Sequence, residues 1–183
     1  MLTIFKKIRF WYGVDRIGPD IPLTHWMLFF PKSMRRLCER KFLSFGNNSE
    51  IRPGAYIVNC SKIRIGSNVV IRPGVYMFAD EREGAGGILV DDDVLIGTSC
   101  HFYVANHEFS DKEKPIISQG YPDSKYSDSI HIERGAWVGA NVVILPGVTI
   151  GANSVIGAGS VVTKSIPSGV IAAGNPAKII RKI

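Results

Sequence analysis

The stretch VTIGANSVIGAGSVVTK, residues 148–164, decides the fold of this chain because it repeats every six residues. An aliphatic residue returns at Ile150, Ile156 and Val162, and small residues fill most of the positions between them. An α-helix buries apolar residues with a period of 3.6, and a half-buried strand buries them with a period of 2. A period of six fits neither, so this stretch belongs to another kind of structure.

The same register extends outward from that stretch. The aliphatic first position of each hexad runs through Ile132, Val138, Ile144, Ile150, Ile156 and Val162. The fifth position is mostly small, as in Ala136, Val142, Val148, Ser154 and Ser160. Earlier blocks keep the period through Ile51 and Ile57, then Ile65, Ile71 and Met77, then Val90, Ile96 and Phe102. The phase slips around residues 80–87 and across residues 108–129.

A period of six is explained if each hexad forms one short flat strand followed by a turn. Three hexads, about 18 residues, then close a triangular coil whose aliphatic residues point inward and stack on the coil below. Small residues and glycines fit the tight corners. Each coil buries its apolar face only against its neighbours, so several coils must stack and the ends need caps. Insertions are expected to leave at corners as external loops.

These hexads resemble the left-handed parallel β-helix acyltransferases, also called the hexapeptide-repeat family. The segment GAWVGANVVILPGVTIGANSVIGAGSVVTK at residues 135–164 and the ending GNPAKIIRKI at residues 174–183 are the motifs of the resemblance. It covers roughly residues 50–183 and is strongest toward bacterial sugar and polysaccharide O-acetyltransferases. The resemblance implies the left-handed sense of the coil, which no spacing here shows. It also implies a homotrimer of parallel prisms with each site between two subunits.

The resulting prediction is an all-β, left-handed parallel β-helix with a short N-terminal helical segment and a C-terminal cap. Residues 1–47 form the N-terminal capping segment, residues 48–170 the β-helix with an external loop at 108–130, and residues 171–183 the C-terminal cap. Two short helices are expected in the N-terminal segment, at MLTIFKKIRFWYG and at PKSMRRLCERKFLSFG, the second of which starts after Pro31 and ends at Gly46. The basic, aromatic character of this segment leaves a second role open, peripheral contact with a membrane interface.

Composition narrows the classes of function. The 183 residues carry a formal net charge of +6 and 45% hydrophobic residues, which suits a globular protein with an anionic partner. No nucleic-acid-binding signature is present. The three cysteines form no CxxC motif, which favours a reducing cytosol over a disulfide framework. The longest apolar patch, residues 26–30, is far shorter than the ~20 residues that span a bilayer. We therefore expect a cytoplasmic protein, with the inner face of the membrane as an alternative location.

His107 is the predicted catalytic residue. A sugar hydroxyl is a poor nucleophile at neutral pH and needs a nearby base, a task that suits histidine. His107 closes the last regular hexad, FYVANH, and opens the polar insertion EFSDKEKPIISQGYPDSKYSDS. The resemblance places the family's catalytic histidine at this junction, with His101 a distant second choice. Glu108, Asp111 or a backbone carbonyl could orient the ring.

A metal and a covalent intermediate are both disfavoured. His101 and His107 lie six residues apart, which places them on adjacent faces of the prism. The γ-type carbonic anhydrases share this fold, but their ligand pattern of two histidines five apart plus an earlier one is absent. Cys100 occupies a small corner position, which packing explains better than nucleophilic catalysis. Direct transfer within a ternary complex is therefore expected, with no metal.

The C-terminal repeats fit a long, phosphorylated acyl donor. Pantetheine is a narrow arm that can lie along a flat side bearing small residues such as Gly139, Ala140 and Ala158. Its phosphates need cations near their end of the molecule. The resemblance to galactoside-type enzymes implies acetyl-coenzyme A contacts at Ala140, Ala158, Thr163, Lys164, Lys178 and Arg181, with Trp137 beside the pantetheine and the acceptor. Ala140 and Lys178 replace a Ser and an Arg of that family. The backbone N–H groups near Gly139 and Ala140 are candidates for holding the developing oxyanion.

The sequence thus predicts an acetyl-coenzyme A dependent O-acetyltransferase of a sugar hydroxyl, acting in bacterial surface polysaccharide biosynthesis. Two alternatives stay open. One is an N-acetyltransferase of an amino sugar or another small acceptor, and the other is a non-catalytic β-helix assembly module. The sequence does not decide which sugar, which hydroxyl or which linkage of the acceptor is used.

Overall fold

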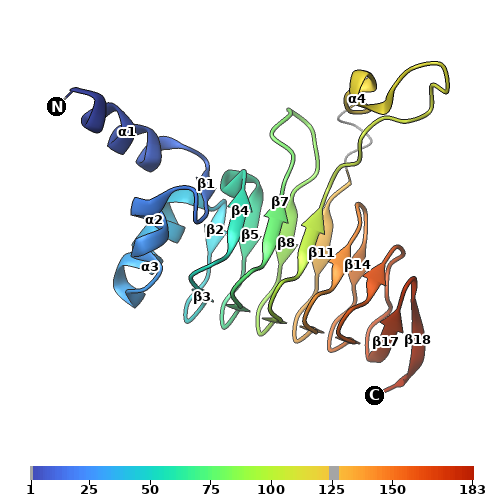
Figure 1. The fold of residues 1–183 in the computed structure, drawn as a ribbon. Coiled ribbons are helices and arrows are strands. Elements are labelled where there is room, and N and C mark those ends of the chain that lie inside the picture. The colour runs from blue at the N-terminus through green and yellow to red at the C-terminus, as the bar shows by residue number, and fades with distance from the viewer. Residues whose placement is uncertain (1, 124–127) are drawn as a thin grey trace.

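The computed structural model describes residues 2–123 and 128–183, and over that range the chain forms a parallel β-helix with helices at its N-terminal end (Figure 1). Short strands line three faces. Sheet A contains β1 (Arg16–Ile17), β4 (Tyr56–Val58), β7 (Tyr76–Phe78), β10 (His101–Tyr103), β13 (Val143–Ile144) and β16 (Val161–Val162). Sheet B contains β2 (Ser44–Phe45), β5 (Ile63–Ile65), β8 (Ile88–Val90), β11 (Ile130–Ile132) and β14 (Thr149–Ile150). Sheet C contains β3 (Glu50–Ile51), β6 (Val70–Ile71), β9 (Leu95–Ile96), β12 (Trp137–Val138), β15 (Val155–Ile156), β17 (Val170–Gly174) and β18 (Ala177–Lys182).

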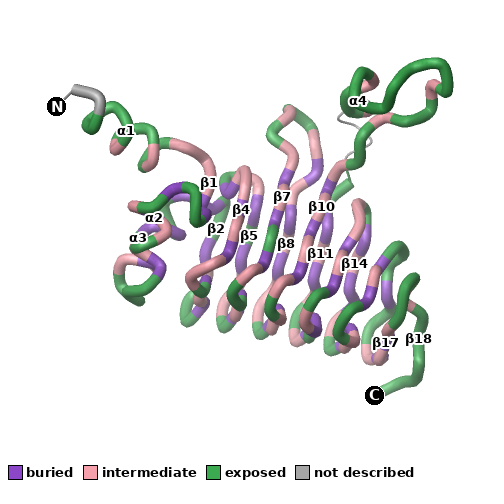
Figure 2. Tube along the Cα trace, in the orientation of Figure 1, coloured by how far each residue is buried: buried purple, intermediate pink, exposed green. Residues whose placement is uncertain are grey.

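The predicted inward residues form one continuous core, which runs through the prism in Figure 2. Every first-position residue of the hexads is at most 1% exposed, namely Ile51, Ile57, Ile65, Ile71, Met77, Val90, Ile96, Phe102, Ile132, Val138, Ile144, Ile150, Ile156 and Val162. Parallel pairing stacks them in columns, as in Met77 on Phe102, Phe102 on Ile144 and Ile144 on Val162. Each buried aliphatic side chain contributes about 1.5–3 kcal/mol relative to an exposed one. The expectation of an inward aliphatic stack is therefore confirmed.

Polar side chains stack at one corner and bond to one another from coil to coil. Asn48, Asn68 and Asp93 adopt left-handed φ values of 58°, 59° and 63° at one corner of successive coils. The Nδ2 atom of Asn48 donates to Oδ1 of Asn68 at 3.3 Å, and Nδ2 of Asn68 donates to Oδ1 of Asp93 at 2.8 Å. Asparagine and aspartate tolerate this conformation better than other side chains. These short polar residues therefore turn the chain and tie one coil to the next.

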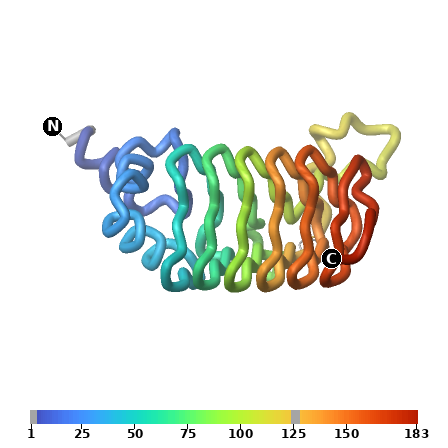
Figure 3. Tube along the Cα trace, turned by 90° about the horizontal axis from the view of Figure 1, so that it is seen from below, coloured from blue at the N-terminus to red at the C-terminus, as the bar shows by residue number. Residues whose placement is uncertain are grey.

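The irregular segments leave the prism at one edge, the corner between sheets A and B. Three successive coils carry them there, namely residues 59–62 with the 3₁₀ turn η1 (Cys60–Lys62), residues 79–87, and residues 104–129 with α4 (Ile116–Gln119). We call this corner the insertion edge. Figure 1 shows the loops after β7 and β10 projecting from the same side, and Figure 3, which looks from below, shows the regular coils in front with the segment after β10 (yellow) extending beyond them. The phase slips noted in the sequence thus lie at one edge of the molecule.

The N-terminal end is more helical than the sequence predicts. Besides α1 (Leu2–Gly13) and α3 (Pro31–Lys41), the chain forms α2 (Pro22–Met27). The prediction that the second helix reaches Gly46 was wrong, because Ser44 and Phe45 pair with β5 and so begin the first coil. No helix among the described residues is both long and apolar enough to cross a membrane. At the other end, β17 and β18 close the prism as an antiparallel hairpin.

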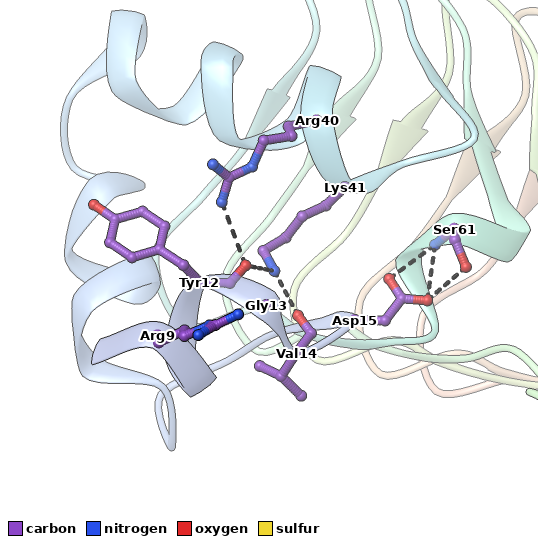
Figure 4. Close-up of a pocket in the computed structure, with 8 residues that line it drawn as sticks. All are labelled: Arg9, Tyr12, Gly13, Val14, Asp15, Arg40, Lys41 and Ser61. Carbon is purple, nitrogen blue, oxygen red and sulfur yellow. Dashed lines mark hydrogen bonds between the residues drawn. The ribbon is translucent and has the colours of Figure 1, made fainter. Parts of the chain in front are cut away.

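A polar joint connects α1 to the prism, as Figure 4 shows. The Nζ atom of Lys41 donates to the carbonyl oxygens of Tyr12, at 3.1 Å, and of Val14. Arg40 donates to the same Tyr12 oxygen at 3.3 Å, and the carboxylate of Asp15 accepts hydrogen bonds from the backbone N–H and the hydroxyl of Ser61. Burial lowers the pKa of Lys41. The cavity of about 630 Å³ beside these groups is therefore explained by the joint between α1 and the first coils.

Candidate active site

A second cavity, of about 600 Å³, opens on the insertion edge. All three irregular corners contribute to it, and its walls are Val58, Asn59, Phe78, Ala79, Asp80, Glu81, Arg82, Tyr103, Val104, Ala105, Asn106, His107 and Tyr121. Adjacent strands of a sheet lie about 4.8 Å apart, so three successive coils give this cavity a length of about 10 Å along the prism. His107, the predicted base, is one of its wall residues, while the cavity beside α1 contains no histidine.

The imidazole of His107 is held at one nitrogen by a backbone carbonyl. Its Nδ1 atom lies 3.3 Å from the oxygen of Gly120, which also accepts the backbone N–H of Glu108 at 2.9 Å. A carbonyl oxygen can only accept a hydrogen bond, so this contact requires a proton on Nδ1, and in the neutral imidazole Nε2 then carries the lone pair. Of the orienting groups left open by the sequence, the structure selects a backbone carbonyl.

The two neighbouring carboxylates are engaged elsewhere in the loop. Glu108 accepts hydrogen bonds from Ser110 and from the backbone N–H of Phe109, and these bonds lower the pKa of the Glu108 carboxyl. Asp111 forms an ion pair with Lys114 at 3.0 Å and accepts the backbone N–H of Glu113. Both acids therefore stabilise turns within residues 108–114 instead of orienting the histidine.

A second contact to His107 comes from Tyr121, whose ring stacks on the imidazole with centroids 4.4 Å apart and planes inclined by 27°. The guanidinium of Arg82, from the preceding irregular corner, lies 5.6 Å from the centroid of the same tyrosine ring. Arg82 also donates to the carbonyl oxygen of Pro122 and forms a two-pronged ion pair with Asp80. The hydrogen bond to Asp80 raises the pKa of Arg82. Sequence reasoning missed these residues, because the slip at residues 80–87 indicates only that an irregular segment exists.

Aromatic side chains line the floor of the cavity on sheet A. Phe78 and Tyr103 point outward and stack with centroids 5.5 Å apart. The stack continues away from the cavity, since Tyr76 lies parallel to His101 at 4.9 Å. The Nδ1 atom of His101 is 3.0 Å from the hydroxyl of Tyr103, so His101 belongs to this outer stack and does not line the cavity. The sequence contains a pattern that predicts this outer stack of aromatic rings. Tyr76 and Phe78 flank the inward residue Met77, just as His101 and Tyr103 flank the inward residue Phe102.

Cys100 is a packing residue. It is fully buried, and its thiol donates to the carbonyl oxygen of Gly139 at 2.9 Å. Burial raises the pKa of this thiol, so it stays protonated and non-nucleophilic at neutral pH. Within residues 2–123 and 128–183, no three His, Cys, Asp or Glu side chains come together as a metal site would require.

The small residues predicted to cradle the donor stack along a different corner, between sheets C and A, which we call the smooth edge. Gly139 approaches the next coil so closely that a Cβ atom would lie 2.7 Å from the nitrogen of Ala158. The Gly139 N–H donates to the carbonyl of Ile156 at 2.8 Å. The Gly139 N–H therefore cannot hold an oxyanion, because the ladder between coils already uses it, and the same role for the Ala140 N–H stays a prediction. Ala140 lies at the same corner, half-buried.

The other residues predicted to contact acetyl-coenzyme A lie at different parts of the prism. Lys178 pairs with Ala173 at the end of the smooth edge, and Arg181 pairs with Ile171 at the other end of the hairpin. Trp137 lies on the outer face of sheet C and is 50% exposed. Thr163 and Lys164 directly follow β16 and so lie at the insertion edge. A single chain thus places the smooth edge and His107 at opposite ends of the strands of sheet A.

Comparison with known proteins adds independent observations. Residues 129–164 match the bacterial transferase hexapeptide family (six repeats). The chain is 37% identical over 148 residues to galactoside O-acetyltransferase of Escherichia coli K12, which covers 80% of this chain and 67% of that protein. A hexapeptide-repeat acetyltransferase of Vibrio cholerae, solved with acetyl-coenzyme A, has a TM-score of 0.71 at 32% identity and covers 89% of this chain and 88% of its own. A polySia-specific acetyltransferase has a TM-score of 0.61 at 35% identity, over 74% of this chain and 58% of that chain.

Proposed function

Because this chain belongs to the hexapeptide-repeat acetyltransferases, we propose that it transfers an acetyl group from acetyl-coenzyme A to a hydroxyl group of a sugar. Membership of the family makes the chain an acyltransferase, and the Vibrio cholerae relative with acetyl-coenzyme A supports that donor. The likeness to these enzymes also supports the left-handed coil. Galactoside O-acetyltransferase, 37% identical, supports a sugar hydroxyl as the acceptor.

His107 acts as the general base in this proposal. Its Nε2 atom takes the proton of the acceptor hydroxyl while the oxygen attacks the thioester carbonyl of the donor. The tetrahedral intermediate then collapses, the carbon–sulfur bond breaks, and the imidazolium returns the proton to the departing thiolate. This step depends on the contact between Nδ1 of His107 and the carbonyl oxygen of Gly120, because that contact leaves Nε2 as the basic nitrogen. His107 also lies in the wall of the cavity, where an acceptor can reach it.

Replacing His107 with alanine tests the proposal. We expect His107→Ala to lower kcat at least ~100-fold, as loss of a general base does, while the Kd for coenzyme A measured by calorimetry stays nearly constant. Release of the coenzyme A thiol measures turnover. The matched control is His101→Phe, which keeps a ring in the stack with Tyr76 and should keep turnover. Full activity of His107→Ala would remove the mechanism, and loss of activity in His101→Phe alone would move the base to His101.

The acceptor in this proposal is a surface polysaccharide or its lipid-linked precursor. A cavity about 10 Å long with Phe78 and Tyr103 on its floor suits the apolar face of a sugar ring, and the polar atoms of Asn59 and Asn106 suit its hydroxyls. The polySia-specific relative supports a polymeric acceptor. A thiol-release panel of polysaccharides, nucleotide sugars and amino sugars separates the possibilities. Turnover with amino sugars alone would favour N-acetylation, and absence of coenzyme A binding would favour an assembly module.

A homotrimer completes the site in this proposal. His107 and the smooth edge lie at opposite ends of the strands of sheet A, so a donor lying along one subunit's smooth edge would be placed to reach the histidine of a neighbour. Lys178 at the end of that edge would pair with donor phosphates. The two predicted residues at the insertion edge, Thr163 and Lys164, would contact the donor from the subunit that contributes the histidine.

The cytoplasmic face of the membrane is the location that we propose. Helix α1 exposes Ile4, Phe5 and Phe10, which are 64%, 66% and 56% exposed, beside the exposed cations Lys6, Lys7 and Arg9. Trp26, Phe29 and Phe30 add exposed aromatic rings around α2. A helix with apolar and basic residues of this kind lies in the plane of an anionic lipid interface. Such a position would bring a lipid-linked acceptor to the enzyme.

A further inference from the structure

We propose that Tyr121 and Arg82 are positioning residues that hold the imidazole of His107 in its catalytic orientation. This inference rests on the proposed function of His107 as the general base. Neither residue needs to touch the reacting atoms. Together they form a chain of contacts from the rigid prism to the histidine, through Asp80, Arg82 and Tyr121.

His107 needs such support because of where it lies. It is an exposed residue on the irregular segment 104–129, and one hydrogen bond of 3.3 Å to Gly120 leaves the ring free to rotate about that contact. A stacked ring 4.4 Å away removes this freedom, because it fixes the plane of the imidazole. The hydrogen bond and the stack together define the direction in which Nε2 points.

Tyr121 cannot supply this restraint alone, since it is exposed and lies on the same segment as the histidine. Arg82 connects it to a different coil. The guanidinium lies 5.6 Å from the tyrosine ring, and its Nη1 atom donates to the carbonyl oxygen of Pro122, the next residue along. The two irregular segments of the insertion edge are therefore joined at this point.

The far end of the contact chain lies where residues 79–87 leave the prism. Asp80 lies two residues after the last residue of β7, and its side chain is only 7% exposed. Nε of Arg82 lies 3.0 and 3.1 Å from the two carboxylate oxygens of Asp80, and Nη2 donates to the same group. One planar guanidinium thus binds a carboxylate, a carbonyl and an aromatic face at once. Lysine lacks the planar fork that such an arrangement requires.

Kinetics of four single variants, a matched control and one double variant test the chain of contacts. We expect Tyr121→Ala and Arg82→Ala to lower kcat about 10- to 100-fold, because a misplaced base loses its geometry, with the KM for acetyl-coenzyme A unchanged within about twofold. Tyr121→Phe keeps the ring and should retain nearly full turnover, whereas Arg82→Lys should resemble Arg82→Ala. The matched control is Arg134→Ala, which breaks another arginine–aspartate pair, with Asp92, on a different corner. The double variant Arg82→Ala/Tyr121→Ala should be no slower than Tyr121→Ala, because both act through one restraint.

A measurement independent of turnover distinguishes loss of the orientation of the His107 ring from a general loss of structure. In protein containing isotope-labelled histidine, the ring current of Tyr121 should shift the imidazole proton resonances of His107, which His107→Gln identifies by their disappearance. Tyr121→Ala should move these resonances toward the values of free histidine, Arg82→Ala should move them in the same direction, and Tyr121→Phe should leave them in place. The resonances of His131, which pairs with Asp91 on another coil, should stay constant throughout.

Two results would overturn the inference. One is a His107 resonance that Tyr121→Ala does not move, and the other is a Tyr121→Phe enzyme as slow as Tyr121→Ala. Failure of the proposed function gives a different result, namely a His107→Ala enzyme that keeps its turnover. The resonance measurement does not depend on turnover, so it would still report whether Tyr121 and Arg82 hold the imidazole ring.

Discussion

At the scale of single residues, one step along a strand separates the core from the candidate site. Met77 and Phe102 point inward and are fully buried, while the next residues, Phe78 and Tyr103, point outward and form the floor of the cavity. This alternation follows from strand geometry, in which successive side chains lie on opposite faces. The aliphatic stack and the aromatic floor are therefore two sides of the same strands.

Cys100 provides a prediction at this scale. We expect Cys100→Ala to keep kcat within about twofold of the parent enzyme, because its thiol is buried, protonated and bonded to the Gly139 carbonyl. Thiol-specific alkylation of the folded protein should also leave Cys100 unmodified, which mass spectrometry of peptides measures. A dead but folded Cys100→Ala enzyme, as judged by circular dichroism, would require a covalent acetyl-enzyme instead of direct transfer.

The inward residues and His107 could be predicted from the sequence for related reasons. Ile144 and Ile156 recur at fixed spacing because each must stack on the coil below, and His107 stands where that spacing ends. Arg82 and Tyr121 could not be predicted, because 39 residues separate them and their contact depends on how two irregular segments fold against each other. Periodicity predicts repeated contacts within the prism and gives no information about contacts between loops.

At the scale of elements, the short strands are stabilised by stacking of one coil on the next. The helices at the N-terminal end lie outside this repeat, so their bounds depend on where the first coil begins. The early end of α3 illustrates the difference. The sequence predicts a helix that ends at Gly46, but α3 ends at Lys41 and backbone pairing of Ser44 and Phe45 with β5 takes the chain into the first coil. Tertiary pairing therefore overrides local preference at this boundary.

Helix α1 is the element whose proposed role is most easily tested. We expect the protein to co-sediment with vesicles that contain anionic phosphatidylglycerol and to bind vesicles of phosphatidylcholine weakly, with binding lost as salt rises. The double variant Phe5→Ser/Phe10→Ser should lose most of this binding, because both rings are exposed on α1.

The matched control for α1 is Ile117→Ser, which removes an apolar side chain that is 92% exposed on α4. This variant should bind vesicles as the parent protein does. Equal loss in both variants, or binding that neither change reduces, would show that α1 is not the membrane contact.

At the scale of the whole molecule, the proposed division of labour between subunits predicts complementation. His107→Ala removes the base and Ala158→Trp fills the smooth edge, so each variant alone should be inactive. In trimers assembled from equal amounts of both, a site is intact where a subunit with His107 faces a subunit with an open edge. Random mixing gives this arrangement at about a quarter of the sites, so thiol release should recover to about a quarter of the parent rate.

The size of the mixed assemblies is checked by analytical ultracentrifugation, and differently tagged chains confirm that both variants occur in one particle. Mixed trimers without any recovered turnover would mean that histidine and donor edge act within one subunit. A monomer at assay concentrations would exclude the shared site directly.

The confinement of the irregular segments to one corner also bears on how such an enzyme changes its substrate. Residues 59–62, 79–87 and 104–129 all leave the prism where sheets A and B meet, while the stacked core and the smooth edge keep their regular coils. Each segment contributes one residue to the core, namely Cys60, Ala79 and Val104, and outside these three positions the segments can be lengthened or replaced without changing the apolar core. New acceptor preferences can therefore arise by exchange of peripheral segments on an invariant scaffold, and an engineer could graft them in the same way.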